Sequence, residues 1–85
     1  MNELESLKKK IKYRSSYRGT KEMDLLLSSF VSEHIDNLSL QDLIKLDDFM
    51  NCSDEDINNF YVNKTPIQFF KDTKILDLFF RHKIL

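Results

Sequence analysis

The scarcity of chain-breaking residues constrains this sequence more than any other feature. Its 85 residues include one glycine, Gly19, and one proline, Pro66. Tight turns depend on glycine, proline and a few polar residues at fixed positions, and no regularly spaced signals of that kind interrupt the chain. We therefore expect helices to dominate. The predicted fold class is all-α, a small single-domain bundle of about five helices that occupies residues 1–85.

Two amphipathic helices are predicted in the first half of the chain. Leu4, Leu7 and Ile11 recur at spacings of three and four, which indicates a basic helix over about residues 3–17. A longer apolar stripe indicates a second helix over about residues 20–35. Because this stripe is the longest apolar face in the chain, we expect its side chains to be buried: Met23, Leu26, Leu27, Phe30 and Val31.

Capping signals predict the remaining helices. The side chains of Ser39 and Ser53 can each accept a hydrogen bond from the third backbone N–H beyond them, which indicates helices ending near residues 50 and 61. Thr65 resembles another cap, with proline at the first helical position. Residues 66–82 then form one helix or two, since the chain could be capped again at residues 71–73.

The composition indicates a folded protein of a reducing compartment. Hydrophobic residues make up 41% and charged residues 32%. The single Cys52 cannot form an internal disulfide, and we interpret it as a buried, inert thiol. No apolar stretch approaches the roughly 20 residues that cross a bilayer, and MNELESLKKK lacks the apolar core of a signal peptide. We expect no membrane insertion and a bacterial cytoplasmic location.

The distribution of charge and the lack of catalytic motifs limit the classes of function expected for this protein. Residues 1–21 carry seven basic and two acidic side chains, whereas residues 22–85 carry six and twelve. The basic end permits nucleic-acid binding, but the acidic remainder would repel a polyanion, so we disfavour that partner. There is no phosphate loop, metal-ligand spacing or nucleophile–base pair, and His34 and His82 stand alone. We predict no enzymatic activity, no metal site and no tightly bound cofactor.

Gly19 marks a charged turn between the first two helices. A left-handed residue costs roughly 1 kcal/mol or more unless it is glycine, so Gly19 is predicted to close the first helix or cap the second. In the second case Glu22 would be the third helical residue. The two preceding arginines could pair with acids elsewhere in the chain. Alternating charges at an exposed turn nevertheless indicate a partner-binding surface: Arg14, Arg18, Gly19, Lys21, Glu22 and Asp24.

This stretch resembles a known family. The pattern Arg-x-x-x-Arg-Gly-x-x-Glu-x-Asp at residues 14–24, followed by Phe30 and by residues 34–39, is similar to the FAD assembly factors of succinate dehydrogenase. The resemblance covers most of residues 10–80. It implies a bundle of about five helices that binds the flavoprotein subunit of succinate dehydrogenase, and in some bacteria fumarate reductase. It also implies that the protein promotes covalent attachment of FAD to a histidine of that partner.

The resemblance assigns Arg18, Gly19 and Glu22 to the core of the partner-binding motif, with Arg14 and Asp24 beside them. It implies that FAD belongs to the partner and that this chain, expected to be a monomer, acts by favouring a reactive arrangement. We expect Arg18 and Glu22 to lie on the surface, where truncation changes the free energy of unfolding by less than about 1 kcal/mol. A nucleic-acid-binding regulator and an antitoxin-like or scaffold protein remain alternatives.

Overall fold

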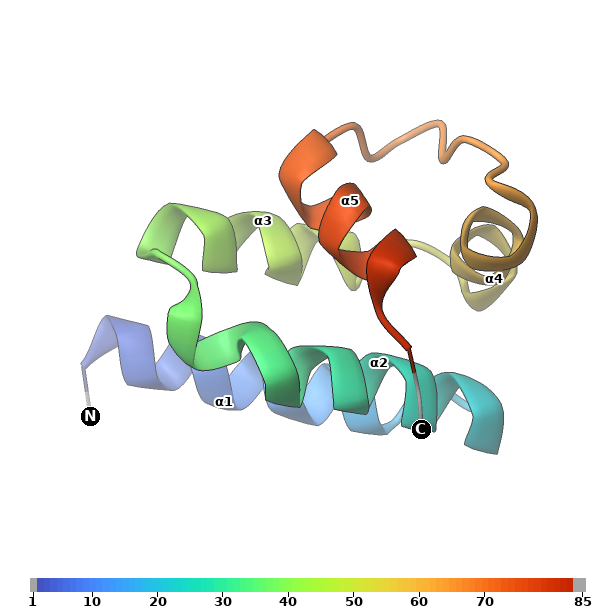
Figure 1. Cartoon of the computed structure of the whole chain (residues 1–85). Helices are drawn as coiled ribbons and strands as arrows, with labels where there is room; N and C mark the ends of the chain where they lie inside the picture. Colours follow the sequence, from blue (N-terminus) through green and yellow to red (C-terminus); the bar gives the residue numbers. More distant parts are fainter. Residues whose placement is uncertain (1, 84–85) are drawn as a thin grey trace.

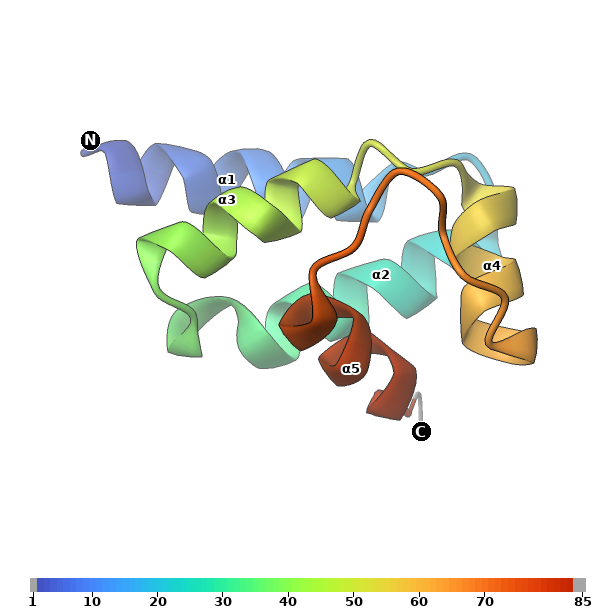
Figure 2. The ribbon, with the colours of Figure 1, turned by 90° about the horizontal axis from the view of Figure 1, so that it is seen from above.

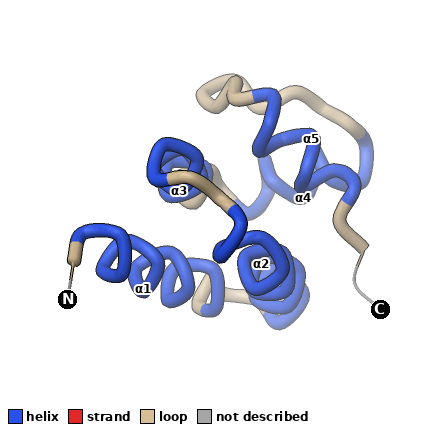
Figure 3. The backbone as a smooth tube through the Cα atoms, turned by 60° about the vertical axis from the view of Figure 1, so that its left-hand side comes forward, coloured by secondary structure: helices blue, strands red, loops and turns tan. Residues whose placement is uncertain are grey.

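The computed structural model describes residues 2–83. Within them the chain folds entirely into helices and loops, and no strand is present (Figure 3). The all-α prediction is confirmed. The described residues form five α-helices and one short 3-10 helix: α1 Glu3–Ser16, α2 Lys21–His34, η1 Ile35–Asn37, α3 Leu40–Phe49, α4 Asp54–Asn63 and α5 Thr73–Arg81.

The helices pack in two layers. Figure 1 shows α1 and α2 side by side in one layer, with α3 lying over them. The view from above shows α4 set at a steep angle beyond the ends of α1 and α3 (Figure 2). Helix α5 packs against both α3 and α4 and so closes the second layer. None of the helices between residues 2 and 83 is long and apolar enough to span a bilayer.

The core forms between the two layers and is centred on aromatic side chains. The Phe79 ring lies 5.2 Å, centroid to centroid, from the rings of Phe30, Phe49 and Tyr61. All five side chains predicted to form the buried stripe of α2 are buried, which confirms that prediction. They pack with residues of α1, η1, α3, α4 and α5 and of the connecting loops: Ile11, Ile35, Leu43, Leu46, Phe49, Met50, Ile57, Ile67, Phe70, Ile75 and Phe79.

The structure corrects the prediction for residues 66–72. Helix α4 ends at Asn63 and is capped by Lys64, whose φ of +57° is left-handed, and no helix starts at Thr65. The chain instead crosses to α5 as a loop that buries Ile67 and Phe70 in the core. Helix α5 begins after Asp72, whose side chain accepts from the backbone N–H of Ile75 at 2.9 Å. A carboxylate at this position is a strong helix cap, and the loop before it carries two apolar side chains into the core.

Asp72→Ala is expected to lower the free energy of unfolding by about 1 kcal/mol, because an unpaired backbone N–H remains at the start of α5. Thr65→Ala is the matched control, since Thr65 is exposed in the loop and caps no helix. Urea denaturation of both variants measures the difference. Equal destabilisation by the two substitutions would contradict the position of this helix start.

Candidate functional site

The connection between α1 and α2 is built around Gly19. Its φ of +124° is a value that residues with a side chain rarely adopt. Tyr17 is the C-cap of α1, and the Thr20 hydroxyl caps α2 by accepting from the backbone N–H of Met23 at 3.2 Å. Gly19 therefore lies between the two caps, and its predicted role as a helix cap is wrong. Glu22 is the second residue of α2 rather than the third.

The Asp24 side chain holds the backbone of this connection through hydrogen bonds. Its Oδ1 atom accepts hydrogen bonds from the backbone N–H groups of Arg18, at 2.5 Å, and Gly19, at 3.3 Å. Asp24 lies in the first turn of α2, where the helix dipole also favours a negative charge. This half-buried carboxylate therefore shapes the turn.

The Arg18 side chain points into the protein and joins three segments. Its Nε donates to Oδ1 of Asp54 at 2.9 Å, and its terminal nitrogens donate to the carbonyl oxygens of Met50 and Cys52, each at 2.6 Å. Met50 ends α3 and Asp54 begins α4, so one guanidinium links the turn to both helices. The side chain is only 10% exposed. The expectation that Arg18 lies on the surface is wrong, because the packing of α3 and α4 brings these acceptors to it.

Arg14 makes a similar internal contact one helical turn earlier. Its Nη1 donates to Oδ1 of Asp47 at 2.8 Å and to the carbonyl oxygen of the same residue at 3.0 Å. Its Nη2 donates to Oδ1 of Asn51 at 2.5 Å. The alternative that the arginines pair with acids of the same chain is therefore confirmed for both. Their proposed contacts with a partner remain predictions.

Ion pairs within the protein also neutralise part of the positive charge of the N-terminal segment. Lys8 pairs with Asp36 at 3.1 Å, and Lys10 pairs with Asp47 at 3.0 Å. Together with the two arginines, four of the seven basic side chains in residues 1–21 contact acids of other elements. Phosphate recognition needs several cations free to face the ligand. The structure therefore gives the nucleic-acid alternative no support.

Lys21 and Glu22 differ from Arg14, Arg18 and Asp24 because their side chains face solvent. Both are exposed, and neither forms an ion pair with any residue between 2 and 83. Glu22 borders an open hollow of about 370 Å³ that is also lined by Asp54 and Glu55. Arg18 partly neutralises Asp54 from the inner side. The turn thus presents a carboxylate and an amine that are free to pair with another molecule.

Exposed apolar side chains close to this turn were missed by the sequence reasoning. Tyr13 and Tyr17 are 67% and 71% exposed, and their rings lie 4.7 Å apart. Leu25 is 53% exposed and lies four residues after Lys21, on the same face of α2. The sequence could have indicated their exposure, because the two tyrosines are four residues apart and lie outside the apolar stripe of their helix.

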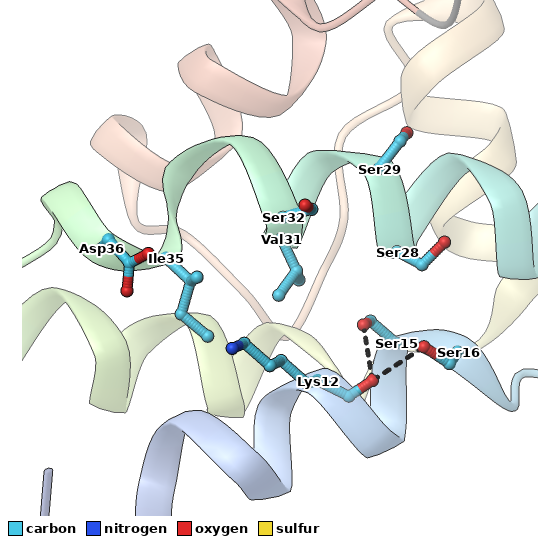
Figure 4. A pocket seen from close by; sticks show the side chains of 9 residues that line it. All are labelled: Lys12, Ser15, Ser16, Ser28, Ser29, Val31, Ser32, Ile35 and Asp36. Carbon is cyan, nitrogen blue, oxygen red and sulfur yellow. Dashed lines mark hydrogen bonds between the residues drawn. The ribbon is translucent and has the colours of Figure 1, made fainter. Parts of the chain in front are cut away.

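A separate hollow of about 520 Å³ lies between α1 and α2 (Figure 4). Serine side chains make up much of its lining. The hydroxyls of Ser15 and Ser16 donate to the carbonyl oxygen of Lys12, at 3.0 and 2.9 Å. Ser28 and Ser29 likewise donate to carbonyl oxygens of their own helix. Because backbone acceptors engage the protons of these hydroxyls, the serines offer a ligand acceptor oxygens rather than free donors.

Cys52 lies beside the Arg18 contacts and is half-buried. Burial raises the pKa of the Cys52 thiol, and the nearby carboxylates of Asp56 and Asp48 raise it further. A thiol that stays protonated at neutral pH is a poor nucleophile. The structure therefore supports the interpretation of this cysteine as inert.

Gly19→Ala is expected to lower the free energy of unfolding by about 1 kcal/mol or more, because a side chain disfavours positive φ. Steric overlap is not the cause, since an added Cβ would meet only Oδ2 of Asp54, at 4.0 Å. Urea denaturation measures the loss, and Gln41→Ala, at an exposed position of α3, serves as the control. Unchanged stability of the glycine variant would contradict the strain argument.

Comparison with known proteins places these features in context. The sequence model of the family described as "Flavinator of succinate dehydrogenase" (Sdh5) matches residues 9–83. The chain is 35% identical over 83 residues to succinate dehydrogenase assembly factor 2-A, mitochondrial, of Drosophila yakuba, covering 93% of this chain and 50% of that protein. It is 36% identical to assembly factor 2-B, mitochondrial, of Drosophila persimilis, covering 93% and 52%. No solved structure gives a significant match.

These relatives overturn one prediction and confirm another. The chain spans about half the length of the curated relatives it matches. They are named as mitochondrial proteins of flies, so the prediction of a bacterial cytoplasmic location is wrong. The family resemblance of the stretch around Gly19 is confirmed, because the match includes that turn and continues through α5. The chain belongs to the Sdh5 family, the flavinators of succinate dehydrogenase.

Proposed function

We propose that this chain is an assembly factor that binds the flavoprotein subunit of succinate dehydrogenase and promotes covalent attachment of FAD to it. The observation that carries the proposal is the family match over residues 9–83, which includes the turn at Gly19. The matched relatives are named assembly factors of succinate dehydrogenase, which agrees with this function.

The proposed contact surface is the solvent side of the Gly19 turn. Lys21 and Glu22 supply charges without an internal partner among the described residues, and Tyr17 and Leu25 supply exposed apolar area nearby in the sequence. Exposed aromatic side chains and charges that become desolvated often dominate the energy of an interface. Hydrogen bonds from inside the protein hold the turn, so little conformational entropy is lost when a partner binds.

The proposed mechanism requires binding and no catalysis by this chain. Flavin attachment would use groups of the flavoprotein itself, once they are held in a reactive arrangement. A factor that binds this arrangement more tightly than others increases its population. The turn supplies recognition groups for a protein surface, and we propose that FAD stays with the partner.

The test is co-expression of the flavoprotein subunit with and without this chain. In-gel flavin fluorescence of the denatured flavoprotein reports covalent FAD only, because denaturation releases flavin that is not covalently bound. We expect the fluorescence per flavoprotein to be higher when the chain is present. Equal fluorescence at equal flavoprotein abundance would contradict the proposed function.

A further inference from the structure

A second polar cluster lies where the chain after α5 returns to α2 (Figure 1). It contains both histidines of the sequence, His34 and His82, together with Glu33. One potential ligand atom from each residue lies within 4.8 Å of the other two. The prediction that the two histidines stand alone is therefore wrong, because the fold brings the segment after α5 onto the last turns of α2.

His82 is buried, and both of its ring nitrogens lie within hydrogen-bonding distance of another side chain. Its side chain is 4% exposed, and Nε2 lies 2.8 Å from the hydroxyl of Ser29, which donates to the carbonyl oxygen of Leu26 at 3.0 Å. In the tautomer that carries its proton on Nε2, His82 donates to Ser29 and leaves the lone pair of Nδ1 available to a metal ion. The other nitrogen, Nδ1, then faces Oε2 of Glu33 at 2.8 Å. A separation of 2.8 Å is that of a hydrogen bond, so a bound metal ion would replace this contact and move the two atoms slightly apart.

His34 lies in a suitable place to supply a third ligand. Its Nε2 lies 3.7 Å from the same carboxylate oxygen of Glu33. Metal–ligand bonds of about 2.0–2.2 Å place the ligand atoms of a tetrahedral zinc ion roughly 3.3 Å apart. The two separations from Glu33, 2.8 and 3.7 Å, lie on either side of this value. The Glu33 side chain is 60% exposed and has room to adjust.

We propose that Glu33, His34 and His82 form a binding site for a divalent transition-metal ion of the zinc class. Two imidazoles and one carboxylate are a ligand set that zinc uses when its fourth position stays open. Ser29 would hold the His82 ring in the tautomer whose Nδ1 binds the metal, as outer hydrogen-bond partners of metal-bound histidines do. The fourth position would open into a hollow of about 360 Å³ that borders the three ligands.

Two basic side chains also border this hollow and oppose a cation. Arg81 is 75% exposed and pairs with Asp77 at 3.3 Å, and Lys83 is exposed. Exposed charges are strongly screened by water and salt, so they lower the metal affinity without abolishing it. Imidazole and carboxylate groups bind a metal ion only when their ligand atoms are deprotonated, so the affinity falls as the pH is lowered.

The site would tie the segment after α5 to α2. A ligand that binds only the folded chain stabilises it by mass action: at a free metal concentration 100 times the Kd, the folding equilibrium constant rises about 100-fold. The metal should therefore raise the melting temperature. This effect does not require a flavoprotein. A negative result for the metal site therefore would not contradict the proposed assembly function, and a negative result for that function would not contradict the metal site.

The direct test uses residues 1–85 without an affinity tag, so that His34 and His82 are the only imidazoles present. Titration with Zn²⁺ by calorimetry should show one equivalent bound, and Zn²⁺ should raise the melting temperature. Titration with Co²⁺ should produce the intense visible absorption of a four-coordinate site. Absence of binding by the wild-type chain with either ion would overturn the proposal, whatever the variants do.

Variants then identify the ligands. Glu33→Gln and His34→Gln each remove one ligand from a position that is not fully buried, and each should weaken Zn²⁺ binding about tenfold or more. Cys52→Ser is the matched control, because this thiol is the chain's other strong zinc ligand and should not contribute. Circular dichroism without metal confirms that each variant is folded. Full affinity in both ligand variants, or loss of binding in Cys52→Ser, would overturn the assignment.

Discussion

Arg18→Ala is expected to lower the free energy of unfolding by about 3 kcal/mol, a large share of the roughly 4–13 kcal/mol that stabilises a folded chain of this length. The substitution leaves the Asp54 carboxylate and the carbonyl oxygens of Met50 and Cys52 without their donor. A hydrogen bond to a charged group contributes about 1.5–3 kcal/mol. Asp54 is 30% exposed, so water recovers part of the loss. Urea denaturation measures the total.

Two variants of the same connection serve as controls. Arg18→Lys keeps the charge but replaces three separate nitrogen donors by one nitrogen, so it should retain only part of these contacts and give an intermediate loss. Lys21→Ala truncates an exposed side chain and should change the free energy of unfolding by less than about 0.5 kcal/mol. If Arg18→Ala unfolds at the same urea concentration as Lys21→Ala, the inward contacts do not stabilise the fold.

These contacts divide the motif at residues 18–22 into two roles. Arg18 and Gly19 shape the turn, and Glu22 presents its charge from it. Loss of flavinylation after substitution of either of the first two residues would not identify a contact with the partner, since a distorted turn gives the same loss. Only an exposed residue without internal hydrogen bonds can be assigned to the interface by mutation.

The helices were predictable because local signals specify them. The period of the apolar stripe predicted α2 and its buried face, and Ser39 and Ser53 mark the starts of α3 and α4 as expected, each accepting from the third N–H at 3.1 Å. The start of α5 was not predictable in the same way. Thr65 and Asp72 are both plausible caps by sequence, and the choice depends on Ile67 and Phe70 reaching a core made by other helices.

The candidate sites were less predictable, because their geometry depends on contacts between distant segments. The sequence identifies Arg18 as important, but its inward direction follows from acceptors contributed by α3 and α4. The pairing of Glu33 with His82 likewise depends on how α5 packs. Spacing rules detect ligands on one helix or one loop, and neither arrangement is of that kind.

Glu22→Ala is expected to leave the chain folded and to reduce covalent FAD on the flavoprotein subunit, if the proposed function holds. Glu22 is exposed and has no ion pair among the described residues, so truncation should change the free energy of unfolding by less than about 1 kcal/mol. A carboxylate desolvated against a partner's cation can contribute about 2–5 kcal/mol, which is roughly 30-fold to 4,000-fold in Kd. Binding should therefore fail before folding does.

The matched control for this variant is Glu55→Ala, which removes an exposed acid at the rim of the same hollow but outside the motif. In-gel flavin fluorescence of the co-expressed flavoprotein and a melting curve of each variant give the two measurements. Wild-type fluorescence with Glu22→Ala would exclude Glu22 from the contact. Equal losses with both variants would show that the acidic hollow as a whole is recognised, because a contact specific to the motif must distinguish two carboxylates that share one hollow.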